Sequence, residues 1–427
     1  MQRYGRAEKM KRSIYIIGGG ASGLSAAIAA ARAGAAVTIL ERQARVGKKI
    51  LLSGNGRCNL GHTGHEFSHY HGTLPQLSRI LQHFDTEAFF LQLGLYVRAD
   101  SEGRMYPFSN MAASVLDALR MEVQKLKITV RTDMMVTDLL PQKNGSWKIL
   151  TQENHSLTAD AVIVAAGGSA APSCGTDGNL LPVLERLGHR IVKPRPALCP
   201  IPSDAARLRA LKGMRVRAAV SLLADGTVCA AETGEVQFTE NALSGICVFN
   251  LSRFSASSKK QMALSLDVLP EAWRSAEDGG MAELERLVQI RGEMPCGELL
   301  SGLLPKRVSE VCVKEAVGTV SAKTADIFSH KKYRMLLFNL LHDWRFPVTG
   351  TAKFAQAQVT AGGVSGQSIT QTLSSNVQQN LYFCGEVLDA DGDCGGYNLD
   401  WAWASGAWAG RHAASPAVQK PERPRRS

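Results

Sequence analysis

The chain has 427 residues, 45% of them hydrophobic and 20% charged, which is typical of a globular protein with two or more domains. The formal net charge is +11, but residues 1–12 carry five bases and one acid and residues 416–427 carry four bases and one acid. The body therefore holds only about +4, which does not favour a nucleic-acid partner. No apolar run reaches the roughly 18 residues of a membrane span. The nine cysteines contain no CxxC pair, which favours a reducing compartment and predicts a cytoplasmic protein.

Residues 13–41 predict a strand, a glycine turn, a helix and a second strand. SIYIIGGG reads as a buried strand entering a turn, ASGLSAAIAAARAG as a helix of small residues ended by Gly34, and AAVTILE as a strand closing on Glu41. The pattern G-x-G-x-x-G falls on Gly18, Gly20 and Gly23, and the acid follows 18 residues after its last glycine. This context is the dinucleotide-binding fingerprint of a Rossmann-like α/β domain.

Each residue of this motif has a physical role in holding a dinucleotide. Gly18 permits the sharp turn, Gly20 lets the backbone approach a pyrophosphate, and Gly23 lets the helix pack against the strand. The helix start at Ala21 and Ser22 offers N–H groups to the phosphates. Glu41, followed by Arg42, can accept hydrogen bonds from ribose hydroxyls. An acid here disfavours a 2′-phosphate, so the site is predicted to hold FAD or NAD rather than NADP.

Two later segments favour FAD. Residues 128–150 predict strands with a turn at KNGS, and ADAVIVAAGG at 159–168 predicts a strand that ends at Ala166 and Gly167. This order is typical of glutathione-reductase-like FAD domains, where a residue such as Val136 covers the adenine by backbone contact. An ordinary β-hairpin is the alternative explanation for Val136.

Residues 381–410 predict a strand, an acidic loop, a glycine pair and a helix. A Gly-Gly-Tyr-Asn sequence at a helix start presents N–H groups to a developing anion such as the reduced flavin. The chain would therefore return to its first domain here. The predicted cofactor-binding residues of this segment are Gly385, Glu386, Asp393, Gly395, Gly396, Tyr397 and Asn398.

In these three segments and beyond them, the sequence resembles the HI0933/YhiN-like family of FAD-dependent oxidoreductases, which includes BaiN-like and aminoacetone oxidase-like flavoproteins. The resemblance covers nearly the whole chain outside the tails. It rests on stretches such as GKKILLSGNGRCN, FTENALSGICVFNLSR, VTGTAKFAQAQVTAGGV and CGEVLDADGDCGGYNLDWAWASG.

The resemblance implies an FAD domain interrupted by an insert with a β-barrel-like part and a helical part. We expect the FAD domain at 1–193 and 347–427, including the basic tails, and a substrate-capping insert at 194–346. Within the insert, residues 214–252 predict strands and residues 281–342 predict helices. The SCGTDG stretch is shorter than the family's pattern, and we expect a local loop difference there.

The segment SGNGRCN at 53–59 follows two lysines and holds a lone cysteine. Lys48 and Lys49 are candidates to neutralise phosphate or approach the flavin. We interpret the segment as a cofactor cradle made by Asn55, Gly56, Arg57 and Asn59, with a Cys58–Cys394 redox pair as the alternative. The histidines of HTGHEFSHYHG are interpreted as a solvated polar loop rather than a metal site.

These features predict an FAD-dependent oxidoreductase that transfers hydride through flavin N5 to or from a small organic molecule. An enone such as that of a 3-oxo bile acid is a substrate that the family resemblance implies, and the residues themselves do not name it. No second G-x-G-x-x-G follows residue 150, so NAD(P)H would bind only transiently as the donor. The alternative is an FAD-containing protein that modifies or binds RNA. The sequence identifies neither a catalytic acid or base nor an oligomeric state.

Overall fold

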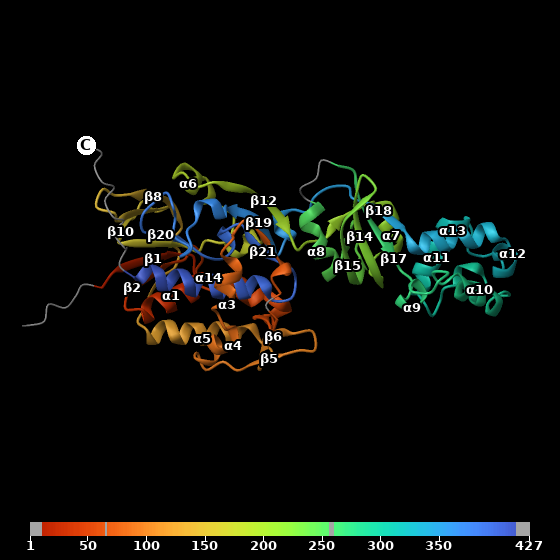
Figure 1. The fold of residues 1–427 in the computed structure, drawn as a ribbon, viewed down its shortest axis with the longest axis horizontal. Coiled ribbons are helices and arrows are strands. Elements are labelled where there is room, and N and C mark those ends of the chain that lie inside the picture. The colour runs from red at the N-terminus through yellow and green to blue at the C-terminus, as the bar shows by residue number, and fades with distance from the viewer. Residues whose placement is uncertain (1–10, 65, 256–259, 416–427) are drawn as a thin grey trace, which may run out of the picture. The chain divides into compact units, whose positions relative to one another are not determined.

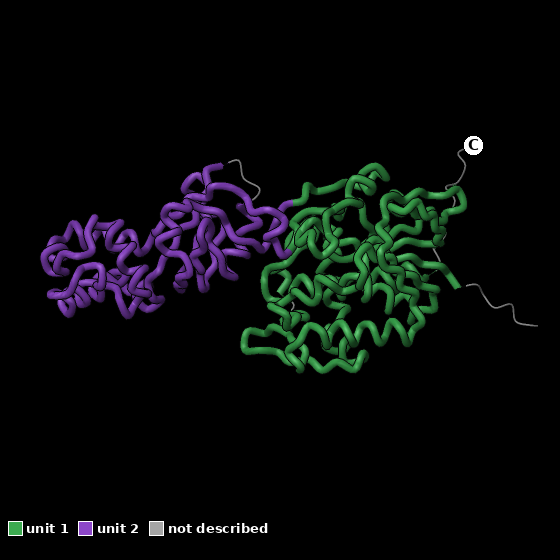
Figure 2. Tube along the Cα trace, turned by 180° about the vertical axis from the view of Figure 1, so that it is seen from behind, with its two compact units in different colours: residues 1–194, 359–427 green, residues 195–358 purple. Residues whose placement is uncertain are grey.

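The protein is described here by a computed structural model, which places residues 11–64, 66–255 and 260–415. His65 and nearly all of both basic tails lie outside the described residues. The chain divides into two compact units (Figures 1 and 2). Unit 1 comprises residues 1–194 and 359–427, and unit 2 comprises residues 195–358.

Unit 1 is built on a five-stranded parallel sheet with the order β20-β11-β1-β2-β7. The strands β1, β2, β11 and β20 are mostly apolar because a parallel sheet is covered on both faces. All four residues of β11 are buried, whereas the three residues of the edge strand β7 are exposed. The predicted Rossmann-like fold is therefore confirmed. The bounds are β1 Ser13–Ile17, β2 Ala36–Leu40, β7 Thr129–Arg131, β11 Ala161–Val164 and β20 Leu381–Phe383.

Two helices from opposite ends of the chain, α1 (Ala21–Arg32) and α14 (Tyr397–Ala414), pack closely against each other (Figure 1). A Cβ on Gly406 would lie 2.3 Å from the Ser22 carbonyl oxygen, and one on Gly410 would lie 2.3 Å from the Ala26 carbonyl oxygen. The small residues of both helices thus allow backbone to approach backbone. This contact joins the two sequence segments of unit 1.

Smaller elements complete unit 1. Strands β8, β9 and β10 form an antiparallel sheet, β3, β6 and β5 form another, and β4 pairs with β21 and β12 with β19. The strands are β3 Gly61–His62, β4 Tyr70–Gly72, β5 Val97–Ala99, β6 Arg104–Pro107, β8 Val136–Pro141, β9 Trp147–Thr151, β10 Ser156–Ala159, β12 Ile191–Ala197, β19 Val359–Val364 and β21 Ala390–Gly392. The helices are α2 Lys48–Leu52, α3 Leu77–Gln82, α4 Thr86–Leu91, α5 Ala112–Lys125 and α6 Leu181–Arg186.

Unit 2 has its own hydrophobic core and an antiparallel sheet of order β13-β16-β15-β14-β17-β18. Its strands are β13 Ile201–Pro202, β14 Arg215–Ala224, β15 Thr227–Phe238, β16 Ala242–Ser244, β17 Met262–Asp267 and β18 Trp344–Pro347. Its helices are α7 Ala205–Leu211, α8 Ile246–Ser255, α9 Glu271–Arg274, α10 Met281–Ile290, α11 Lys306–Val317, α12 Thr324–Phe328 and α13 Lys331–His342. The end of the segment expected to be rich in strands is thus the helix α8, whose Cys247, Val248 and Leu251 share the buried side.

Candidate functional site

The candidate site lies at the carboxyl ends of the parallel strands. Gly18 follows β1, Glu41 follows β2, Ala166 comes two residues after β11, and Gly385 two residues after β20. The strand that follows β1 in the chain, β2, lies on one side of β1 in the sheet, and β11 lies on its other side. Ligands of open α/β sheets bind outside the carboxyl ends of the strands at such a switch point. The topology therefore brings four separately predicted segments to one edge.

The three motif glycines meet different surroundings. A Cβ on Gly18, whose φ is +105°, would lie 2.4 Å from the Ala165 carbonyl oxygen, and one on Gly23 would lie 1.9 Å from the Gly18 carbonyl oxygen. A Cβ on Gly20 would meet no described atom within 4 Å. Gly18 and Gly23 are therefore required by packing, whereas Gly20 leaves space at the start of α1. The first N–H groups of a helix have no intrahelical acceptor, so this start can donate to an anion.

Glu41 is a buried carboxylate beside the glycine turn. Its Oε2 accepts a hydrogen bond from the Gly19 N–H at 2.7 Å, and its Oε1 accepts one from the Gln43 N–H at 2.8 Å. Burial raises the pKa of the Glu41 carboxyl, and the two N–H donors oppose that shift. An ionised carboxylate has about four acceptor positions, so about two remain for hydroxyl donors.

Arg42, the Glu41 backbone and Val136 are each held by contacts with other segments of unit 1. Arg42 forms an ion pair with Asp177 at 2.7 Å. The Glu41 carbonyl accepts from the Met134 N–H at 2.9 Å, which places Val136, at the start of β8, near the same edge. The Val136 carbonyl accepts from the Asn179 side chain at 3.0 Å.

The Gly385–Val387 turn packs against the start of α1. A Cβ on Gly385 would lie 2.4 Å from Ser22 Oγ, and the Gly385 N–H donates to Ser405 Oγ at 2.9 Å. The neighbouring Glu386 forms an ion pair with Lys49 at 2.7 Å and accepts from the Thr360 N–H at 3.0 Å. Lys49 is therefore joined to this turn.

Two other predicted positions lie beside these segments. Lys48 donates instead to the Ser173 carbonyl at 2.7 Å. On the β11 side, Gly167 takes the left-handed conformation, with φ +74°, and a Cβ there would lie 2.8 Å from Thr176 Cγ2.

The SGNGRCN segment is a chain of left-handed turns. Gly54, Asn55, Gly56 and Cys58 all have φ between +55° and +81°, a conformation that costs non-glycine residues energy and concentrates at functional sites. Asn55, Gly56 and Arg57 are exposed. The Arg57 guanidinium lies 4.9 Å from the centre of the Tyr106 ring.

Asn59 connects this segment to the start of α14. Its Oδ1 is buried and has no hydrogen-bond partner among the residues the structure describes. A Cβ on Gly396, the residue before α14, would lie 2.6 Å from that oxygen and 2.3 Å from the Gly61 carbonyl oxygen. The unpartnered Asn59 oxygen therefore lies where the backbone of Gly396 comes close to that of Gly61.

The geometry does not favour thiol chemistry at Cys58. Its side chain is fully buried, and burial raises its pKa to about 11 while a hydrogen bond from Ser53 opposes the shift. Reactive thiolates need a lowered pKa and access. Cys58 forms no disulfide bond with Cys394 or with any other cysteine that the structure describes.

The GGYN residues fix the entry to α14. Asn398 donates from Nδ2 to the Gly392 carbonyl at 2.6 Å and accepts from the Gly392 N–H at 2.9 Å. The Tyr397 ring is stacked between His62 and His69, at centroid distances of 5.0 and 4.7 Å. Gly395, with φ +133°, completes the turn.

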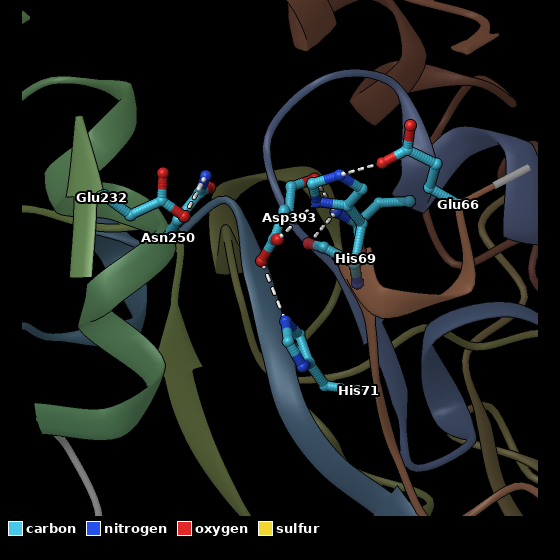
Figure 3. A network of polar contacts seen from close by, with 8 residues as sticks. Glu66, His69, His71, Glu232, Asn250 and Asp393 are labelled. Carbon is cyan, nitrogen blue, oxygen red and sulfur yellow. Dashed lines mark hydrogen bonds and ion pairs between the residues drawn. The ribbon is translucent and has the colours of Figure 1, made fainter. Parts of the chain in front are cut away.

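Two histidines were wrongly interpreted as part of a solvated loop. His69 and His71 each hydrogen-bond the carboxylate of Asp393, which is only 8% exposed (Figure 3). Within residues 11–64, 66–255 and 260–415, no cluster of three or more His, Cys, Asp or Glu side chains could hold a metal ion.

Three observations show that the residues of this site are suited to bind an FAD-like dinucleotide. Gly20 leaves open space at a helix start, Glu41 keeps acceptor positions beside it, and the Asn59 oxygen is buried without a partner. The sequence did not indicate Thr360, whose N–H donates to Glu386, or Ser405, whose Oγ accepts from the Gly385 N–H. Thr360 lies in the VTGTAKFAQAQVTAGGV stretch, which could have drawn attention to it.

The fold is Rossmann-type, and the chain is an FAD-dependent oxidoreductase. The chain belongs to the HI0933-like family, because the model of the HI0933-like protein Rossmann domain matches residues 12–412. In the described part of the chain, no helix has the length and apolar character needed to span a membrane.

Three known proteins illustrate the similarity. The chain is 37% identical to the 3-dehydro-bile acid delta(4,6)-reductase of Clostridium scindens, over 94% of this chain and 98% of that protein. It is 27% identical to the ribosomal RNA dihydrouridine synthase of Haemophilus influenzae, over 91% and 95%. A solved structure of 3-ketosteroid-delta4-(5alpha)-dehydrogenase from Rhodococcus jostii is 15% identical, covers 96% of this chain and 98% of that chain, and gives a TM-score of 0.47.

Proposed function

We propose that this protein reduces a carbon–carbon double bond conjugated to a carbonyl group in a small ring-bearing molecule, with FAD bound in the cradle. The observation that carries the proposal is the 37% identity, over nearly the full length, to a 3-dehydro-bile acid reductase. The cradle at the sheet edge supports the cofactor assignment. A steroid-like enone is the substrate class that this relative suggests.

The relatives share a reaction type even though their substrates differ. The first saturates a double bond in a 3-dehydro-bile acid, and the ribosomal RNA dihydrouridine synthases of Haemophilus influenzae and Escherichia coli saturate one in uridine. A double bond conjugated to a carbonyl is polarised, so its far carbon accepts a hydride. Both activities therefore suit one flavin site.

Within this proposal, the chain's residues bind and orient the cofactor. The space at Gly20, with the N–H groups of Ala21, Ser22 and Gly23, receives the pyrophosphate, and Glu41 accepts from the adenosine ribose. The start of α14 at Gly396 and the Asn59 amide face the flavin. FAD supplies hydride transfer when bound, and the protein orients and tunes it.

The electron donor in this proposal is NAD(P)H, which would bind transiently at the flavin. The chain holds a single G-x-G-x-x-G, which the cradle uses. The nine cysteines, among which the structure shows no disulfide bond, suit a reducing compartment and support a cytoplasmic location.

An anaerobic two-step experiment tests the proposal. NADH or NADPH is mixed with the FAD-loaded protein, and bleaching of the oxidised flavin absorbance is followed. The bleached protein is then mixed with a 3-keto-4,6-diene steroid, which we expect to restore the absorbance in stoichiometric amount. A protein that no nicotinamide donor bleaches, or that no enone reoxidises, would refute the proposal.

Ribosomal RNA is the second candidate substrate, because two relatives at 27% and 28% identity act on it. Charge counts weigh against it. Outside residues 1–12 and 416–427, unit 1 has 19 bases and 19 acids, and unit 2 has 21 bases and 17 acids. Undermodified ribosomal RNA that reoxidises the reduced flavin faster than the enone does would favour this candidate. A steep salt dependence of RNA affinity that survives deletion of both tails would support the same conclusion.

A further inference from the structure

Asp393 holds two imidazole rings at the entrance to α14. Its Oδ2 lies 2.9 Å from His69 Nδ1 and its Oδ1 lies 2.9 Å from His71 Nε2 (Figure 3). The Asp393 N–H also donates to the His69 carbonyl at 2.9 Å. The three residues come from segments more than 300 residues apart, and the antiparallel pairing of β4 with β21 brings them together.

The geometry of this group sets how its hydrogen bonds run. An ionised carboxylate only accepts hydrogen bonds, so each ring must present an N–H to Asp393. The second nitrogen of His69 lies 3.2 Å from a Glu66 carboxylate oxygen. Both ring nitrogens of His69 are thus within hydrogen-bond distance of carboxylate oxygens, and its ring is stacked on Tyr397. Asp393 orients the ring of His71, as the acid of a catalytic triad orients its histidine.

The location of the group suits a reaction at the flavin. Asp393 lies two residues before Gly395, in the loop that leads to the proposed flavin-facing end of α14. The side chains of His71 and His69 are 18% and 36% exposed, so neither ring is sealed within the core.

We propose that His71 delivers the proton that completes reduction of the substrate double bond, with Asp393 and His69 as its positioning residues. This inference rests on the proposed function. A hydride from reduced FAD, itself reduced by a nicotinamide donor, forms the new C–H bond at the far carbon of the enone, and the double-bond electrons move toward the carbonyl. His71 then gives its proton to the carbon next to the carbonyl, forming the second C–H bond, and regains a proton from water. The substrate gains two electrons and the reduced flavin loses two.

The two half-reactions separate this role from cofactor binding. In His71→Gln, we expect wild-type FAD affinity and wild-type bleaching by the nicotinamide donor. Reoxidation of the reduced flavin by the enone should slow about 100-fold or more, since general acids contribute about 10²- to 10⁴-fold. Asp393→Asn should slow the same step, and His69→Gln should slow it less than His71→Gln. His155→Gln, at an exposed turn, is the matched control and should leave both steps unchanged.

A measurement without turnover accompanies the kinetics. Asp393→Asn should move the nitrogen-15 shifts of both the His69 and the His71 rings in the cofactor-free protein, because each ring hydrogen-bonds the Asp393 carboxylate. Reoxidation of His71→Gln within threefold of wild type, or His69→Gln slower than His71→Gln, would overturn the inference while the proposed function stands. Ring shifts unchanged by Asp393→Asn would also overturn it. A wild-type protein that the enone cannot reoxidise overturns the proposed function and this inference with it.

Discussion

Replacing Gly20 by alanine should separate FAD binding from folding. The new Cβ would meet no described atom within 4 Å, and the Gly20 backbone has φ −80°. Reduced freedom of the unfolded chain favours alanine by about 0.4–1 kcal/mol, and the N-cap preference for glycine over alanine opposes it by a similar amount. The free energy of unfolding of the cofactor-free protein should therefore change by less than about 0.5 kcal/mol.

The same methyl group occupies the space where we place the pyrophosphate. Losing one hydrogen bond to a charged group costs about 1.5–3 kcal/mol, which corresponds to a roughly 10- to 150-fold weaker Kd for FAD. Thermal unfolding followed by circular dichroism gives the stability, and quenching of FAD fluorescence gives the Kd. Gly350→Ala is the control, because its Cβ also meets no described atom within 4 Å and the position lies in unit 2. An unchanged FAD affinity in Gly20→Ala would refute the placement of the phosphates.

Three further predictions follow from the same cradle. Gly23→Ala places a Cβ 1.9 Å from a backbone oxygen, so overpacking should cost about 1–3 kcal/mol and lower the Tm of the cofactor-free protein by about 2–5 °C; a Tm within 1 °C of wild type would contradict the packing. Burial raises the pKa of Glu41, so the folded state binds more protons above the unfolded pKa of about 4.3, and stability from this group falls as pH rises through the folded pKa. Glu41→Gln should therefore lessen the fall in cofactor-free stability above that pH in denaturant titrations, and an identical pH slope would count against it. Cys58→Ser should keep its FAD and its turnover, because the raised pKa keeps this thiol protonated; alkylation of native protein should reach the exposed Cys229 before Cys58, and the reverse order would revive the redox alternative.

The parts of the fold that could be predicted from the sequence are those whose residues lie close together in the chain and form a recognisable pattern. The turn from Gly18 to Gly23 and the acid at Glu41 lie within one strand-helix-strand unit, so spacing alone indicates them. The short apolar run ICVFNL gave no such signal, because buried strands and short helices are alike at this length, and it proved to be part of α8.

The interactions that sequence reasoning missed join distant segments. His69 and His71 lie more than 300 residues before Asp393, and nothing in the HTGHEFSHYHG pattern indicates which carboxylate they meet. Thr360 and Glu386 meet only because β19 and the Gly385 turn fold onto the same edge. Such pairings depend on tertiary packing, which no single sequence window contains.

The closure of unit 1 by α14 also constrains how the chain folds during synthesis. β1, α1 and β2 leave the ribosome before the rest of unit 1, and the edge strand β20 and the helix that covers α1 are made about 350 residues later. At typical translation speeds of about 5–20 residues per second, the apolar side of α1 stays without α14 for roughly 20–70 seconds. Unit 2 is continuous in sequence and has all its strands and helices by residue 347. When residue 347 has been made, the nascent chain therefore has every strand and helix of its second unit while its first unit still lacks β20 and α14.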